Sequence, residues 1–399
     1  MLELAADVRP PQWTWNPTFE NRERYERRIN SDFLSSRPDN KTEWFARFRP
    51  GLVANGPGKA RITIVYQFGY SESTTTSRPT GLPTQHRTTV RSNSDLFQGN
   101  VEWGSGPWRI TAGRYLFVLG DGRIVAGLQS WGNLGRTFDG LRAKGRGWDL
   151  FLFKPGVNTG YNPEQTALGI SKSTSIGQST FLGYQNDRTA RLTRFGTLDH
   201  LWKAKFGCVS TTAEGAFQFG HTNGVSTEAW LAYAKARVPV NAKVDVALEL
   251  TAASGGQSAS KVRTFLPPYP TGAFPYGVDV LTGNRNINKL GVVAIYRPAP
   301  GLRVSGEWNT LSLRDAKDGW YGLGNTINPG PNGAYRDPSG AAGRDVGRFW
   351  QIEANYEPNP HLRFLVGFGV MTPGKFIRSL NGGVANDQTW AAAQFTYKF

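Results

Sequence analysis

The sequence predicts an all-β protein, a transmembrane antiparallel β-barrel of about 18 strands, with about 16 as the alternative. Three observations lead to this prediction. Apolar and polar residues alternate with a period of two in many separate runs, which indicates strands with one apolar face. Several runs reach about ten residues, the length of a tilted membrane-spanning strand, whereas globular strands average about five to six. Short turns also alternate with long polar loops, as at the two rims of an outer-membrane barrel.

The strands are assigned in order from this alternation and from the turns between them. The predicted strands are 14–29, 41–53, 60–70, 95–103, 107–118, 121–130, 136–143, 146–154, 177–186, 196–206, 211–221, 227–238, 243–253, 287–297, 301–312, 346–357, 361–372 and 387–399. The middle of the chain alternates least regularly, and this assignment leaves 155–176 as an unusually long periplasmic connection. The last strand ends on Phe399 because it closes the barrel against the first strand, which holds the terminus in the sheet.

Two kinds of connection join these strands, and all of them belong to one barrel domain, 1–399. The short turns, rich in Pro, Gly and Asn, are 55–59, 104–107, 239–243, 297–301 and 357–361. The long loops are 71–94, 254–285, 313–345 and 373–386, of which 254–285 and 313–345 are the longest. With 1–13 as an N-terminal periplasmic segment, the short turns face the periplasm and the long loops face outward.

Composition excludes several classes of protein. No run approaches the roughly 18 apolar residues of a membrane helix, so a helical membrane protein is excluded. Cys208 is the only cysteine, which rules out an intramolecular disulfide; we expect a small side chain near a turn there. The first residues lack the pattern of a signal peptide, so we expect an exported protein whose signal has been removed. Lys and Arg number 46 against 30 Asp and Glu, a net charge of +16.

That positive charge is expected mainly inside the barrel, on the face opposite the apolar residues. Alternation assigns the following luminal positions, in which bases outnumber acids: Arg24, Arg47, Arg49, Lys203, Lys235, Arg237, Glu249, Arg303, Glu353 and Arg363. Rings of Arg and Lys in a pore select anions, and guanidinium groups bind carboxylates in a bidentate way. The alternative is that these charges pair across strands and stiffen the wall, with rim lysines facing lipopolysaccharide.

The segment 113–153, GRYLFVLGDGRIVAGLQSWGNLGRTFDGLRAKGRGWDLFLF, resembles the alginate-export family of outer-membrane proteins. Weaker similarities are scattered over nearly the whole chain. The resemblance implies an eighteen-stranded barrel with a narrow basic constriction through which an anionic polyuronate leaves the cell. The positions that match the motif, several of them expected near the constriction, are Arg114, Asp121, Arg123, Arg136, Asp139 and Arg142.

Three functions follow, of which the first two are transport functions. The leading hypothesis is a passive channel for an anionic polysaccharide or oligosaccharide such as alginate. A general or small-anion-selective porin is the second. The third is a barrel that serves as an anchor or receptor, in which the aromatic, Pro-rich stretch 265–277 is either a lid over the pore or a docking surface.

Catalysis is not expected, although His221 lies near Ser210 and Ser226, because no nucleophile motif frames either serine. No cofactor is expected, and Asp315 and Asp318 are the candidates for weak Ca²⁺ binding in a loop. The expected partners are anionic saccharides or small anions, outer-membrane lipid and lipopolysaccharide, and periplasmic export proteins, with no role for nucleic acid.

Overall fold

Eighteen strands close into one antiparallel barrel in the computed structural model, which describes residues 12–34, 39–77, 83–127, 132–156, 164–188, 192–270, 282–331 and 333–399. The barrel strands are β1 (Thr14–Ile29), β2 (Asp39–Asn55), β3 (Arg61–Ser77), β4 (Gln85–Ser105), β5 (Trp108–Tyr115), β6 (Phe138–Gly145), β7 (Trp148–Pro155), β8 (Gln165–Ser173), β9 (Gly177–Asn186), β10 (Thr193–Phe206), β11 (Val209–Thr222), β12 (Val225–Pro239), β13 (Val244–Ala253), β15 (Ile287–Ala299), β16 (Leu302–Leu313), β17 (Asp345–Asn359), β18 (Leu362–Pro373) and β19 (Gln388–Lys398). The short elements are η1 (Pro57–Lys59), β14 (Lys261–Val262) and α1 (Lys375–Leu380). Within the described ranges, no helix is both long and apolar enough to span a bilayer.

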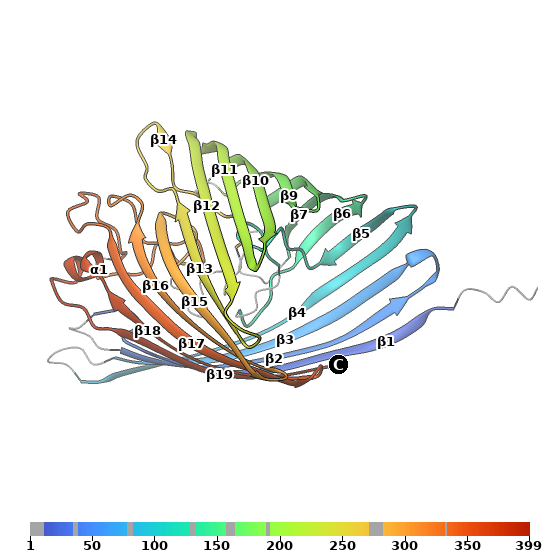
Figure 1. Ribbon diagram of the computed structural model, residues 1–399, viewed down its shortest axis with the longest axis horizontal. Helices are drawn as coiled ribbons and strands as arrows, with labels where there is room; N and C mark the ends of the chain where they lie inside the picture. Colours follow the sequence, from blue (N-terminus) through green and yellow to red (C-terminus); the bar gives the residue numbers. More distant parts are fainter. Residues whose placement is uncertain are drawn as a thin grey trace, which may run out of the picture.

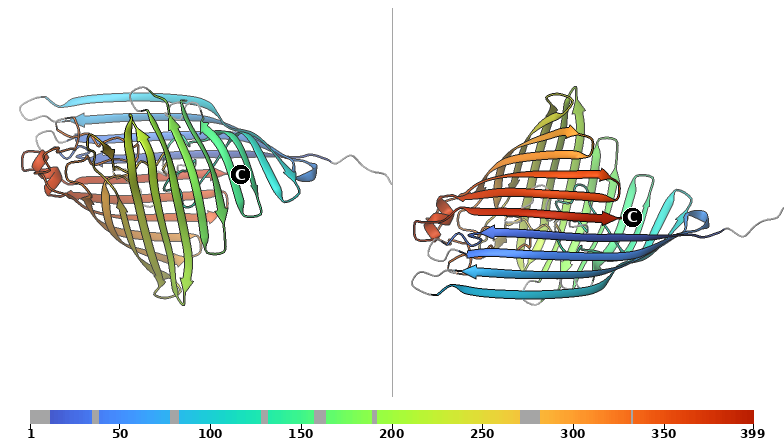
Figure 2. Two further views of the ribbon diagram at one scale, coloured as in Figure 1. Left: turned by 90° about the horizontal axis from the view of Figure 1, so that it is seen from above. Right: turned by 90° about the horizontal axis from the view of Figure 1, so that it is seen from below.

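The barrel closes where its two ends meet. Strand β1 pairs with β2 on one side and with β19 on the other, in a register that sets Glu26 opposite Ala392. Strands β1 (blue) and β19 (red) lie side by side in Figure 2. Elements α1 and β14 lie at the end of the barrel away from the C-terminus (Figure 1). Closure satisfies the backbone groups of both terminal strands, so the sequence-based prediction of a closing last strand is confirmed.

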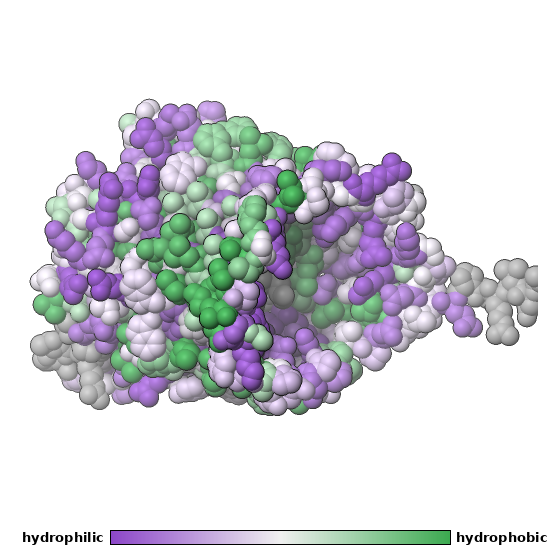
Figure 3. Space-filling model, viewed as in Figure 1, coloured by the Kyte–Doolittle hydropathy of each residue, from purple (hydrophilic) through white to green (hydrophobic). Residues whose placement is uncertain are grey.

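Side chains alternate between a lipid-type outer face and a lumen, as the sequence predicts. On β13, Val246, Leu248 and Leu250 are 37–47% exposed on the outside, whereas Asp245 and Glu249 face inward and are buried. Figure 3 shows hydrophobic residues over the outside of the strands and a hollow bordered by hydrophilic residues. A barrel with apolar residues outside and polar residues inside is the arrangement that a membrane requires.

The two rims differ as predicted. One rim carries short connections such as 56–60, 146–147 and 207–208, and Cys208 is exposed in the last of these. The opposite rim carries most of the long connections, including 254–286 and 314–344. We call these the short-turn rim and the long-loop rim.

Two predictions in the middle of the chain are wrong. The segment 121–130 is not a barrel strand: its described part folds into the lumen, where Ile124 and Val125 are almost fully buried. Conversely, β8 lies within 155–176, which was expected to be a connection. A short apolar run does not distinguish a wall strand from a buried loop, and the small inward residues of β8 weaken its alternation. The two errors cancel, so the predicted count of eighteen still holds.

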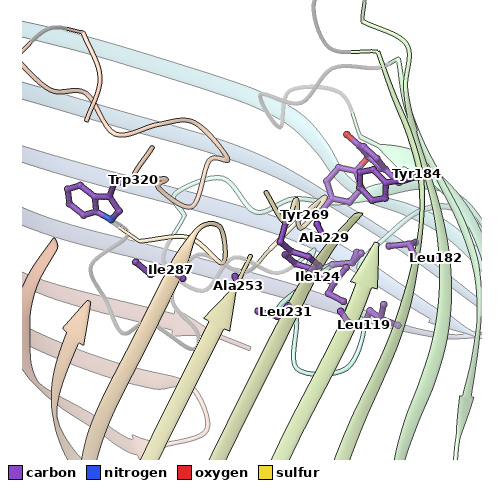
Figure 4. Close-up of a cluster of buried hydrophobic side chains, with 14 of the residues drawn as sticks. Leu119, Ile124, Leu182, Tyr184, Ala229, Leu231, Ala253, Tyr269, Ile287 and Trp320 are labelled. Atoms are coloured by element: carbon purple, nitrogen blue, oxygen red, sulfur yellow. The ribbon is translucent and has the colours of Figure 1, made fainter. Parts of the chain in front are cut away.

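The apolar core lies inside the barrel. Figure 4 shows Leu119, Ile124 and Tyr269, from the inserted segments 116–127 and 265–270, among wall residues that include Leu182 and Leu231. The interior next to β7–β13 is therefore filled by packed loops, whereas the interior next to β1–β3 is lined by polar side chains.

Candidate functional site

The described parts of the segment 116–137, residues 116–127 and 132–137, enter the lumen between β5 and β6 and are the central feature of the interior. One part of it is held against the β10–β12 wall. The guanidinium of Arg123 donates to the carboxylate of Glu214 on β11 and lies 3.4 Å from the ring centroid of Tyr233 on β12. Nearby, Lys203 Nζ on β10 lies 2.6 Å from the Asp121 carboxylate.

The end of the same segment contacts the β1–β3 wall. Asn133 Nδ2 donates to the carbonyl of Tyr70 at 2.9 Å, and Arg47 donates to the carbonyl of Asn133 at 3.1 Å. Arg22 donates to the carbonyl of Gly132 at 2.7 Å. The inserted segment thus makes polar contacts with two separate parts of the wall, and it narrows the lumen between them.

A cluster of four guanidinium groups lines the β1–β2 wall at this level. Arg24 pairs with Glu26 at 2.7 Å, and Arg47 donates to Glu20 at 2.8 Å. Arg49 donates to Gln67 at 2.7 Å. Its nearest acid is Glu20, at 3.5 Å, which is farther than the acid partners of Arg24 and Arg47. With Arg22, these residues form what we call the guanidinium cluster: Arg22, Arg24, Arg47 and Arg49. The four cations share two neighbouring carboxylates, those of Glu20 and Glu26, and Arg28 also pairs with Glu26 at 3.1 Å.

The wall from β12 to β15 holds charges in a more balanced way. Glu249 lies between Lys235 at 3.2 Å and Lys289 at 3.3 Å. Closer to the short-turn rim, Asp245 is 2.7 Å from both Arg237 and Arg297. Lys235, Arg237 and Glu249, which the sequence assigned to the lumen, face the interior. Each base of this group has an acid partner, which is the cross-strand pairing that the sequence left as the alternative.

A polar cavity of about 370 Å³ opens inside the β2–β6 wall. Arg61 and Arg142 line it together with Glu102 and Asn100. Arg142 is held by Asp149 through contacts of 2.8 and 2.6 Å, so its guanidinium is fixed in place. This cavity offers charged side chains to a solute near the short-turn rim.

The remaining predicted residues lie on the β16–β18 wall. Arg303, Glu353 and Arg363 are partly exposed on its inner face. Arg363 donates to Asn355 at 2.6 Å and lies 3.5 Å from Glu357.

The structure corrects two pairs of predicted pore-lining residues. Arg114 and Asp139 pair at 2.6 Å, but their register places them on the face of Leu141, which is 55% exposed on the outside. They lie where β5 ends and β6 begins, next to the point at which the chain turns inward.

Arg123 and Arg136 lie inside the barrel but are almost completely buried. Arg136 donates to the carbonyls of Ala126 at 2.9 Å and Pro270 at 3.3 Å. Both guanidinium groups hold the inserted segments in place.

Sequence reasoning missed Glu214, Asn133 and Tyr233, the partners that hold the inserted segment. Glu214 is an acid on an otherwise small and neutral luminal face of β11, next to Ala216 and Gln218. That isolation is a signal for a buried partner, since an ionised carboxylate inside a protein requires one. Nothing in the sequence assigns Arg123 to it.

The long-loop rim is held by buried polar and aromatic contacts. Asp318, a candidate Ca²⁺ ligand, accepts hydrogen bonds from Gly256 N at 2.8 Å, Gly319 N at 2.7 Å and the Tyr321 hydroxyl at 2.8 Å. Its oxygens are thus used by protein donors, which argues against the predicted weak Ca²⁺ site. No group of three or more potential metal ligands occurs in the part of the chain that the structure describes. Burial raises the pKa of Tyr321 to about 12.

The stretch 265–277 is described only up to residue 270. Phe265 and Tyr269 are fully buried in the apolar core, so this part of the stretch does not form an exposed docking surface. The other predicted residues, 271–277, lie outside the described ranges.

Solved structures with the same architecture come from Pseudomonas aeruginosa. OpdD (OccK7) is 12% identical, with a TM-score of 0.63 and coverage of 96% of this chain and 99% of that one. OpdQ is 13% identical, with a TM-score of 0.58 and coverage of 96% and 98%. The outer-membrane protein OpdK is 15% identical, with a TM-score of 0.57 and coverage of 96% and 99%. At these identities the likeness shows the fold alone.

Sequence comparison identifies the family. No curated protein matches the chain, but the family model described as alginate export matches residues 16–391, nearly its whole length. The short turns then face the periplasm, as in other barrels of the bacterial outer membrane. The protein is an outer-membrane channel, and it belongs to the alginate-export family.

Proposed function

We propose that the protein is a passive channel for anionic saccharides, polyuronates of the alginate type above all, and that the β1–β2 wall guides them. The guanidinium cluster is the observation that carries this proposal. Its four cations face two carboxylates, so the wall keeps a net positive charge at the level of the inserted segment. Periplasmic export partners would deliver the polymer to the short-turn rim.

The proposed path starts at the polar cavity. Arg61 and Arg142 offer charges to the first carboxylates, and the guanidinium cluster follows deeper in the lumen. A polyuronate carries one carboxylate on each sugar. The arginines of the polar cavity offer it weak sites, and the guanidinium cluster, whose members are 2–5% exposed, attracts it through its positive field. Glu102, Glu20 and Glu26 compete with the polymer for these arginines, which keeps any one site from holding it too tightly.

A small-anion porin is the second candidate, and one observation favours it. The inserted segment and the apolar core fill the lumen beside β7–β13, which leaves less room for a polymer than an empty barrel would. A structurally similar protein, OpdK, has been crystallised with vanillate, a small carboxylate. The two candidates differ in whether longer oligomers bind more tightly.

Transport without catalysis is part of the proposal. His221 lies opposite Ser226 across the β11–β12 hairpin, while Ser210 is at the other end of β11. Since the proposal gives His221 no role in transport, a His221→Ala variant should keep full channel activity. The anchor or receptor hypothesis loses support from the burial of Phe265 and Tyr269.

The test is electrical. The protein is reconstituted in a planar bilayer, the reversal potential is measured across a salt gradient, and oligouronates of graded length are then added. Anion selectivity with block that strengthens with length is expected. Anion selectivity with block independent of length would favour the small-anion porin, and cation selectivity would overturn both proposals.

A pair of variants locates the path. Arg61→Ala should weaken block by oligouronates, because it removes a charge from the polar cavity. Arg27→Ala is the matched control, since Arg27 is exposed on the outer face of β1. Equal block in both variants would show that the polymer does not pass the cavity.

A further inference from the structure

A groove of about 640 Å³ lies on the outer surface of the barrel across β7–β12. Register explains its shape, because two rows of directly paired residues cross these strands. The row nearer the short-turn rim is polar and consists of Trp148, Lys172, Ser179 and His200. The next row is apolar and consists of Ile170, Phe181, Leu198 and Phe217.

The polar row lies at the membrane interface near the periplasm. Trp148 is the first residue of β7, directly after the turn 146–147, and Lys172 is the penultimate residue of β8. Tryptophan and lysine are the side chains that favour the level of lipid headgroups. The apolar row lies two residues further along each strand, deeper in the membrane, and its side chains are 37–52% exposed.

The polar row is arranged as a cluster of donors. Lys172 Nζ lies 4.7 Å from the Trp148 ring centroid and donates to the carbonyl of Arg146 at 2.9 Å. His200 Nδ1 lies 2.8 Å from the Ser179 hydroxyl. Arg146 adds a second cation in the adjoining turn. The acid among the lining residues, Asp199, belongs to the luminal face of β10 and is 7% exposed.

The floor of the groove is left open by a glycine. Gly215 follows His200 in the polar row, and a Cβ placed on it would meet no atom within 4 Å. Ala232 continues the row on β12. The open floor at Gly215 and Ala232, beside the ring of Phe217, has room for a hydrocarbon chain.

The geometry points to a specific binding site for one membrane phospholipid of the periplasm-facing leaflet. Its phosphate would be held by Lys172, His200 and the Ser179 hydroxyl, and an acyl chain would lie over Gly215 against Phe217 and Leu198. The ammonium of Lys172 and the imidazole of His200 match the anionic headgroup of a phospholipid, and the adjacent apolar row matches its acyl chain. This inference does not depend on which solute passes the lumen.

Native mass spectrometry of the protein released from detergent with added phosphatidylglycerol tests the site. One retained lipid per barrel is expected. Lys172→Ala should lower the apparent affinity about fivefold, the effect expected of one cationic side chain near anionic lipid. Gly215→Leu should abolish retention by filling the groove, and it should fold because Gly215 lies outside the left-handed region.

Two control variants match these changes. Lys59→Ala removes another lysine of the short-turn rim that donates to a carbonyl, that of Gly106. Gly306→Leu adds the same side chain at an outward position of β16, where a Cβ would meet no atom closer than 3.9 Å. Both controls should retain the lipid as the unmodified protein does.

Other outcomes overturn the inference. Retention that is equal in Lys172→Ala, Gly215→Leu and the two controls would show only nonspecific coating by lipid. Equal retention of uncharged diacylglycerol would remove the role of the phosphate. Preferential retention of lipid A would assign the groove to the other leaflet. Unchanged single-channel conductance in each variant confirms that the barrel has folded.

Discussion

The β1–β2 wall and the β10–β12 wall face the same lumen but hold their charges in different ways. On β1–β2, four guanidinium groups share two carboxylates, and two of the four, those of Arg22 and Arg47, contact backbone carbonyls of the inserted segment. On β10–β12, Arg123 is matched to Glu214, stacks on Tyr233 and is enclosed by the apolar core. The comparison shows that a basic residue in the lumen can be matched to one enclosed acid or share its acids with other bases, and that its surroundings decide which.

Breaking the Arg123 contact has the largest expected effect. Arg123→Ala leaves Glu214 buried without its cation, which costs about 3–5 kcal/mol when one partner of a buried pair is removed. The inserted segment should then leave the β10–β12 wall, and single-channel conductance should rise. Urea unfolding and conductance measure the two effects.

The double variant Arg123→Met, Glu214→Gln is the control, because it removes both charges and keeps similar volumes. It should recover most of the stability. If Arg123→Ala alone unfolds at the same urea concentration as the unmodified protein, the pair does not hold the segment.

The long-loop rim at the end of β1 gives a smaller effect. The Tyr335 hydroxyl donates to the carbonyl of Asp32 at 2.7 Å, and its ring packs against Phe33 and Trp320. Tyr335→Phe removes that hydrogen bond and should cost about 0.5–1.5 kcal/mol. Hydrogen exchange of the loop amides measures the loss, and Tyr296→Phe, an exposed outer position, should show none.

The same residue predicts a pH dependence. Burial raises the pKa of Tyr335 to about 12 from the ordinary value of 10.0. A folded-state pKa above the unfolded value means that the contribution is complete below pH 10 and is lost as the pH rises through 12. Loop protection should therefore fall at alkaline pH in the unmodified protein, and Tyr335→Phe should reduce that fall.

The exposed Lys203–Asp121 pair of the inserted segment tests how strongly burial determines the stabilisation by an ion pair. Lys203→Ala removes the pair with Asp121, but Lys203 is 54% exposed and Arg123 remains 3.5 Å from the same carboxylate. The expected loss is about 0.2–1 kcal/mol, as for a surface ion pair. A loss in urea unfolding as large as that of Arg123→Ala would contradict the comparison.

The smallest effect concerns selectivity at the β1–β2 wall. Arg24→Ala removes one cation while Glu26 keeps Arg28 at 3.1 Å. A unit charge about 10 Å away in water contributes about 0.4 kcal/mol, with opposite sign for an anion and a cation, so the anion-to-cation permeability ratio should fall about fourfold. Reversal potentials measure this ratio. Arg27→Ala, on the opposite face of β1, should leave it unchanged, and an equal shift in both would show that the cluster does not face the path.

The sequence predicted much of the wall because strand alternation is a local property. Residues such as Leu248 and Glu249 are assigned to opposite faces by their positions alone, and the structure agrees. The sequence-based assignment failed at 121–130 and at β8, because a buried segment and a wall strand have similar local patterns there. Among the candidate site residues, it placed Arg47 and Arg49 on the inner face but assigned Arg114 and Asp139 to the lumen.

The sequence alone specified that this chain forms a barrel with an apolar outside and two unlike rims, because the period of two and the positions of turns encode these features. The tertiary structure was needed to show that the segment around Arg123 enters the lumen, that Glu214 holds it, and that Lys172 and His200 line one groove on the outer wall. Those contacts join residues far apart in the chain, and their free energy depends on burial and on partners that no local pattern specifies.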